Sequence, residues 1–140
     1  CAEGGPRAPL LAGLAEAEHL LMLALLRRQR RSPSAMATLG AALHELQLLH
    51  EAGGIVTAFS ADRYCAAFDR LLQARLLELR GGAAAAESGR LYVPCRSLVG
   101  HLYVQLAQDL QSSGAPALSN PLRGLPQAAQ QWVVRQLAEQ

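Results

Sequence analysis

Three segments in the first half of the chain repeat apolar and polar residues with the period of an α-helix. The third is the best defined of them. Ser60 is a good N-cap residue, because its hydroxyl can accept a hydrogen bond from an amide of the first turn. Tyr64, Phe68 and Leu71 then share one apolar stripe. The pattern predicts helices over residues 14–31, 35–52 and 60–74.

Two short apolar-rich runs follow the third helix, at residues 76–80 and 90–94. The Gly- and Ala-rich residues 81–89 lie between them, and glycine permits the positive φ values that a hairpin connection requires. We therefore expect a β-hairpin. Helix, helix, helix, strand, strand is the order expected of a winged helix-turn-helix fold.

The remaining segments extend this unit. Residues 97–111 have the apolar spacing of a helix. Residues 112–121 are rich in Ser, Gly and Pro, which is typical of a linker, and a last helix is predicted to start at Pro126. The predicted fold is mainly α, a winged helix-turn-helix of three helices and a two-stranded β-hairpin wing, with a C-terminal helical extension. Residues 1–13 form a linker or disordered lead-in, 14–95 the winged-helix domain, and 96–140 helices that pack on it or on a partner.

Composition adds little about partners. The chain has 13 basic residues, all of them Arg, against 11 acids, and its pI is near 8.7. This excess is too small to establish nucleic-acid binding, and codon bias in a GC-rich genome explains arginine without lysine more simply. Cys1, Cys65 and Cys95 lack Cys-x-x-Cys spacing, which favours a reducing intracellular compartment.

Nothing in the chain indicates a membrane protein. The apolar run at residues 20–26 is too short for a membrane span, and it has the wrong flanking charges for a signal peptide. The first residue is Cys rather than Met, so we expect a fragment of a larger protein.

The residues that enzymes and metal sites use do not form a known pattern here. A phosphate-binding loop needs a lysine, which this chain lacks, and its histidines form no pair on one helix face. Ser60, His101 and Asp109 lack the setting of a hydrolase triad, and Ser60 already has the simpler role of a cap. Cys65 is better explained as a packed residue than as a nucleophile. We expect no enzyme, no metal and no cofactor in this fragment.

The arginines of the third helix and the hairpin are candidate DNA contacts, because winged helices usually place that helix in the major groove and the wing on the backbone. They are accompanied by one glutamine. The candidates are Arg63, Arg70, Gln73, Arg80 and Arg90. The alternative is that these are solvated arginines beside acidic neighbours.

Three further residues are candidate contacts to a partner. Arg27 and Arg28 belong to a basic cluster where the first helix ends, a position that suits cations even without a partner. Trp132 either closes the core or docks on another chain.

Two motifs carry a resemblance to a known family. Residues 67–77 read Ala-Phe-Asp-Arg-Leu-Leu-Gln-Ala-Arg-Leu-Leu, and Pro126 is followed by Gln131 and Trp132. The first resembles the Ala-Phe-acid-x-Leu-x-Gln-x-x-Leu-Ile segment in the C-terminal region of the origin recognition complex subunit 4 family. The second is similar to that family's closing Pro-x-x-x-x-Gln-Trp helix. The order of elements also agrees over residues 20–137, although the Ala-rich tip and the stretch before the last helix depart from the family pattern.

The resemblance implies a non-catalytic winged-helix domain in a nuclear assembly that encircles origin DNA and helps to load the replicative helicase. It implies three kinds of partner: other origin recognition complex subunits, double-stranded DNA and helicase-loading factors. Two alternatives belong to other classes: a winged helix that binds only proteins, and a transcription regulator. Against the regulator, the outer face of the third helix offers only Gln73 between its arginines for reading bases.

Overall fold

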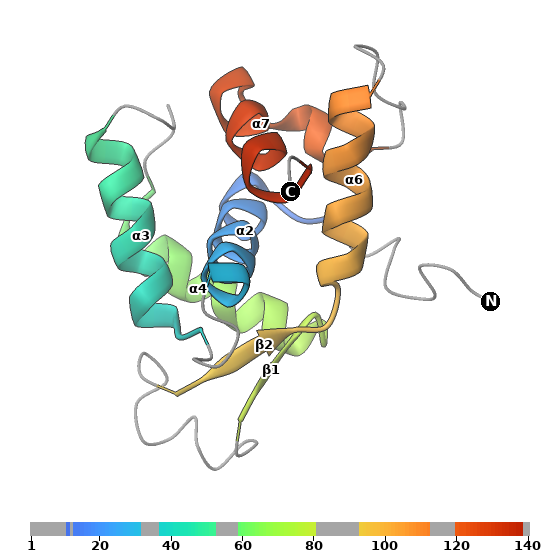
Figure 1. The fold of residues 1–140 in the computed structure, drawn as a ribbon. Helices are drawn as coiled ribbons and strands as arrows, with labels where there is room; N and C mark the ends of the chain where they lie inside the picture. The colour runs from blue at the N-terminus through green and yellow to red at the C-terminus, as the bar shows by residue number, and fades with distance from the viewer. Residues whose placement is uncertain are drawn as a thin grey trace, which may run out of the picture.

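The computed structural model describes residues 11, 13–31, 37–52, 59–80, 93–112 and 120–138 of the chain. These residues form a mainly helical fold with a small antiparallel sheet (Figure 1). The elements in chain order are α2 (Glu16–Arg31), α3 (Leu39–Glu51), α4 (Ala61–Gln73), β1 (Leu77–Leu79), β2 (Cys95–Ser97), α6 (Gly100–Ser112), the 3₁₀ turn η3 (Pro121–Gly124), α7 (Gln127–Val133) and the π-helical turn η4 (Val134–Ala138).

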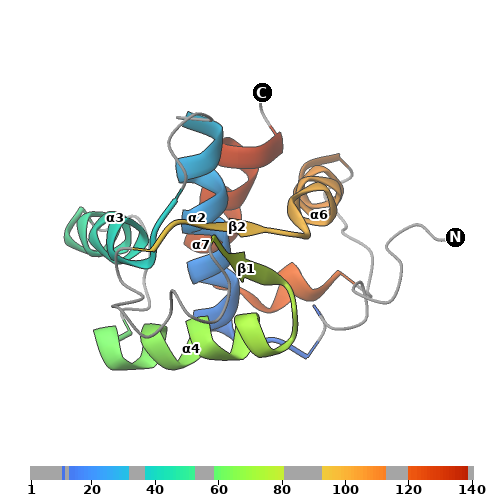
Figure 2. The same ribbon diagram turned by 90° about the horizontal axis from the view of Figure 1, so that it is seen from below.

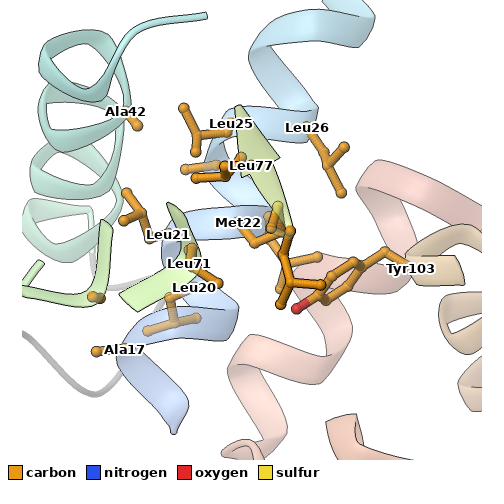
Figure 3. Close-up of a cluster of buried hydrophobic side chains, with 14 of the residues drawn as sticks. Ala17, Leu20, Leu21, Met22, Leu25, Leu26, Ala42, Leu71, Leu77 and Tyr103 are labelled. Atoms are coloured by element: carbon orange, nitrogen blue, oxygen red, sulfur yellow. The ribbon is translucent and has the colours of Figure 1, made fainter. Parts of the chain in front are cut away.

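Helix α2 is the centre of the core. Ten consecutive side chains, at residues 17–26, are buried. A helical segment that is buried on all sides must be covered on all sides, and the other helices surround α2 (Figures 1 and 2). Figure 3 shows Leu21 and Leu25 reaching toward Ala42 of α3, while Tyr103 of α6 enters from the opposite side. The apolar run that is too short to span a membrane is therefore the buried axis of the fold.

Helix α4 confirms the prediction for residues 60–74 almost to the residue. The Ser60 hydroxyl accepts a hydrogen bond from the Arg63 amide at 3.2 Å, so Ser60 is the N-cap. The apolar stripe is buried, with Phe68 and Leu71 fully enclosed. After Ala74 the chain turns at Arg75, whose φ of 62° lies in the left-handed region, and enters β1.

The β-hairpin is also confirmed, but its second strand lies further along the chain than expected. Strands β1 and β2 pair antiparallel, with Leu77 opposite Ser97 and Leu79 opposite Cys95. The expected strand at residues 90–94 is wrong in position: residues 93 and 94 are not in a strand, and the rest, like the tip at 81–89, lies outside the described residues. The register is set by Cys95, which is buried and donates its amide to the Ala37 carbonyl at 2.8 Å. The apolar content of residues 90–94 led to a predicted strand that ends just before the observed one begins.

The Ala37 bridge ties the segment before α3 to the sheet. Ala37 forms an isolated antiparallel bridge with Cys95, the first residue of β2. The chain then enters α3 at Thr38, whose hydroxyl accepts from the Ala41 amide. This cap explains why α3 begins at Leu39 rather than at residue 35.

The other predicted helix boundaries shift by a few residues for local reasons. Helix α2 begins at Glu16 rather than at residue 14, and the Glu18 carboxylate accepts from the Ala15 amide at 2.8 Å. Helix α6 begins at Gly100 rather than at residue 97, because Ser97 belongs to β2. Pro126 is the N-cap of α7 rather than its first helical residue.

The C-terminal helices pack on the rest of the chain. The Tyr103 hydroxyl of α6 lies 2.9 Å from Nδ1 of His19 on α2, and Arg27 of α2 donates to Gln136 of η4 at 2.8 Å. Of the predicted linker at 112–121, residues 113–119 lie outside the described residues, as does most of the predicted lead-in at 1–13. No helix among the described residues has both the length and the apolar character needed to cross a lipid bilayer.

Candidate nucleic-acid interface

The outward face of α4 carries three of the five candidate DNA contacts. Arg63, Arg70 and Gln73 are all exposed, as the helical pattern predicts. The guanidinium carbon of Arg63 lies 5.7 Å from the centre of the Phe59 ring, a cation–π contact that holds this side chain at the start of the helix. The charge of Arg63 remains in contact with water.

Arg70 is exposed but forms an ion pair with Glu18 of the core helix α2. Its Nε lies 3.6 Å from Oε1 of Glu18, and its terminal nitrogen donates to the Gly13 carbonyl at 3.5 Å. The Glu18 side chain is only 8% exposed, so this carboxylate is held in place beneath the guanidinium. Arg70 is therefore a weaker anion-binding group than its exposure alone suggests.

The whole outward side of α4 is close to neutral. Asp62 and Asp69 accompany the two arginines on this helix, and Asp62 is exposed. Two positive and two negative side chains on one helix give little net attraction for a phosphate backbone. The exposure of the candidate residues agrees with the DNA hypothesis, whereas the local charge does not strengthen it.

At the hairpin, Arg80 is exposed just after β1, and its amide donates to the Pro94 carbonyl at 2.8 Å. Arg90 lies outside the described residues. Arg96, which the sequence pattern did not single out, is exposed on β2 and pairs across the strands with Glu78 at 3.2 Å. The alternation of side chains along a strand would have placed Arg96 outward, had the strand been assigned to the correct residues.

The end of α2 is the most basic part of the described surface. Its last turn contains Arg28, Arg30 and Arg31, and Arg27 directly precedes that turn. Arg27 forms a close ion pair with Glu45 of α3, and terminal nitrogens of Arg28 and Arg31 lie 3.9 and 3.8 Å from that carboxylate. Within the described residues no acid pairs with Arg30.

Trp132 is a packing residue in this structure. It is 3% exposed and lies in the same buried cluster as Val133 and Leu137. The burial of the indole favours the first of the two alternatives for Trp132, that it closes the core.

A groove of about 530 Å³ runs between α3 and the start of α4. Phe59 and Tyr64 line one side, and His50 lies 3.4 Å from the Tyr64 hydroxyl. Burial, followed by the charge of Glu16, raises the pKa of Tyr64 to about 12, so its hydroxyl stays protonated at neutral pH. The described residues that line the groove include no Ser, Cys or Lys side chain that could act as a nucleophile.

Three residues of types that could serve catalysis are engaged in packing or hydrogen bonds here. The Ser60 hydroxyl caps α4, and Asp109 accepts from the Asn120 side chain at 2.9 Å. Cys95 is buried, and desolvation raises the pKa of its thiol to about 12, which keeps it in the unreactive protonated form. Among the described residues, no three His, Cys, Asp or Glu side chains are placed to hold a metal ion.

No protein family model, no curated protein and no solved structure matches this chain. Its function is therefore inferred from the geometry above and from the resemblance in two segments. The first of these, residues 67–77, covers the end of α4 and the entry to β1, and the second lies at the start of α7.

Proposed function

We propose that the chain is the winged-helix domain of an origin recognition complex subunit. In this role it is a non-catalytic module that contributes to DNA encirclement, subunit assembly and origin licensing in the nucleus. The observation that carries the proposal is the direct passage from α4, through the left-handed turn at Arg75, into an antiparallel hairpin. Three helices followed at once by a hairpin is the winged-helix order.

Two features of the described residues support the winged-helix assignment. Helix α2 packs on both α3 and α4, so the three helices form one bundle. The Ala37–Cys95 bridge then joins the segment between α2 and α3 to β2, which fixes the base of the hairpin on this bundle. A wing needs such a base to hold its tip at a constant angle to the third helix.

The role in an origin complex comes from the resemblance. The family-like segment at residues 67–77 falls where the third helix passes into the hairpin, and Gln131 and Trp132 fall on the closing helix α7. The positions of these two segments support the proposal.

Duplex DNA is the partner that can be tested most directly. The purified chain should bind a short duplex of mixed sequence, with an affinity that falls between about 50 and 200 mM salt, because each phosphate contact releases counterions. The double variant Arg63→Ala, Arg70→Ala should weaken binding and reduce the salt slope by about 0.9 for each phosphate that is no longer neutralised. Arg123→Ala, an exposed change on η3, is the control for a simple loss of charge.

Two outcomes of this titration count against the proposal. One removes only the contact made by α4, and the other removes DNA binding altogether. If the double variant and the unmodified chain bind with the same slope, α4 does not contact DNA. If the unmodified chain shows no salt-dependent binding, DNA contact is removed from the proposed function.

A protein-interaction module without DNA is the second candidate. The balanced charges on α4 favour it, and so does Leu48 of α3, which is 52% exposed. Leu48 is the large apolar side chain that the described residues leave most open to water. Under this alternative, Leu48→Glu abolishes association with neighbouring subunits, whereas the arginine variants leave that association unchanged.

A further inference from the structure

Within the described residues, the end of α2 carries more positive than negative charge. We call the residues Arg27, Arg28, Arg30 and Arg31 the arginine turn. Glu45 is the acid that pairs with it among the described residues, so four arginines against one glutamate leave an excess of three positive charges. This excess lies within the last five residues of the helix, where the charges act together on a polyanion.

The members of the arginine turn differ in how firmly they are held. Arg27 is 23% exposed and is fixed from two sides, by Glu45 of α3 and by Gln136 of η4. Arg28 and Arg31 are 44% and 60% exposed and lie beyond ordinary hydrogen-bond distance from Glu45. Arg30 is exposed as well. One arginine thus anchors the turn, and the others extend into water.

The two ends of α2 have opposite roles. Its first turn carries Glu16 and Glu18, and Glu18 partly neutralises Arg70 of α4. Among its charged residues, the last turn carries only arginines. The core helix therefore lowers the positive charge near α4 and raises it at the opposite end.

The arginine turn lies beside the base of the hairpin. Gln29, within the same turn of α2, accepts a hydrogen bond from the Ser97 amide of β2 at 3.4 Å. Figure 2 shows β2 crossing α2 between α3 and α6. A duplex approached by the hairpin would have the end of α2 close to its backbone.

We propose that the arginine turn binds the phosphodiester backbone of duplex DNA next to the hairpin, and that it contributes more to this binding than α4 does. The inference rests on the DNA contact in the proposed function. Guanidinium groups suit phosphate oxygens, since they donate two parallel hydrogen bonds and keep their charge at any physiological pH. The contact would carry no sequence preference.

An acidic protein segment fits this surface less well than DNA. Protein interfaces depend on apolar or aromatic anchors at their centre. The apolar side chains nearest in sequence, Leu25 and Leu26, are 1% and 7% exposed and face the core. The exposed side chains of the arginine turn are cationic, and neither Leu25 nor Leu26 offers an apolar anchor beside them, as in contacts to a nucleic-acid backbone.

The test compares two pairs of substitutions that remove the same charge. Arg30→Ala, Arg31→Ala should reduce the salt slope of duplex binding by about 1.8, the value for two phosphate contacts. Arg63→Ala, Arg70→Ala should reduce it by less, because Arg70 is the arginine that pairs with Glu18 among the described residues, whereas the Glu45 carboxylate near Arg31 is already paired with Arg27. The lysine pair Arg30→Lys, Arg31→Lys keeps the charge and should retain most of the slope. Circular dichroism of each variant establishes that it is folded.

Each result has a definite meaning. A larger loss of slope in the α2 pair than in the α4 pair, with recovery by lysine, supports the inference. An equal loss in both pairs is what a general effect of net charge would give, and it overturns the inference. A loss in the α4 pair alone overturns it too, but leaves the proposed function standing. If the unmodified chain fails to bind DNA, both the inference and the proposed DNA contact fall.

Discussion

At the scale of single residues, His19 is the most informative polar group of the core. It is 3% exposed, and its Nδ1 lies 2.9 Å from the Tyr103 hydroxyl. The two rings also meet edge to face, with centres 5.9 Å apart. Burial lowers the pKa of His19 to about 4, because the charged imidazolium would lose its hydration. The contact between α2 and α6 therefore requires a neutral histidine.

Stability should fall as the pH drops below the ordinary pKa of histidine. His19 takes up a proton near pH 6.5 in the unfolded chain but only near pH 4 in the folded one, so the unfolded state binds more protons between these values. The free energy of unfolding is therefore not reduced by His19 above about pH 6.5. It falls by about 3 kcal/mol as the pH decreases from there to about 4. Urea titrations across this range would measure the loss.

The variant His19→Gln isolates this contribution, because glutamine keeps a hydrogen-bonding side chain but does not titrate. Its free energy of unfolding should change less with pH than that of the unmodified chain. Acidic side chains titrate in the same range, so the difference between the two profiles is the relevant quantity. Parallel profiles would show that His19 is protonated in the folded state without penalty.

At the scale of elements, α4 depends on its N-terminal cap. Ser60→Ala removes the acceptor for the Arg63 amide and should cost about 1 kcal/mol of unfolding free energy. Ser60 is exposed, so the change disturbs no packing. Ser60→Asp keeps an acceptor at the same position and is the matched control. Equal stability of all three proteins would mean that water replaces the cap without cost.

Elements defined by local interactions were predictable, and those defined by distant contacts were not. The cap and the stripe of α4 lie within that helix, so its sequence was sufficient to place it. The position of β2 depends on Cys95 meeting Ala37, which is 58 residues earlier in the chain by the difference of the two numbers. A short strand has too few residues for its own pattern to reveal such a contact.

In the candidate site, too, local features were predictable from the sequence, and contacts between distant segments were not. Helical spacing correctly predicted that Arg63, Arg70 and Gln73 are exposed on α4. It could not reveal that Glu18 of another helix lies beneath Arg70, or that the arginines at the end of α2 share one carboxylate from α3. Charge balance depends on which elements pack together, and for that reason the arginine turn gains importance only from the structure.

At the scale of the whole molecule, α2 joins two groups of helices into one core. Leu71 of α4 packs in the cluster around α2, and Tyr103 approaches the same helix from α6 (Figure 3). Trp132, the chain's single tryptophan, belongs to the same buried cluster, on α7. A change on one side of α2 should therefore affect the other side.

Leu71→Ala tests this coupling. Leu71 is fully buried, so the truncation should cost about 3 kcal/mol. Far-UV circular dichroism reports all the helices, whereas the fluorescence of Trp132 reports the C-terminal ones. If the molecule unfolds as one unit, the two transitions coincide in the unmodified chain, and both move to lower denaturant by the same amount in the variant. A tryptophan midpoint that stays in place while the dichroism midpoint shifts would show that the C-terminal helices fold independently of the unit formed by α2, α3, α4 and the two strands.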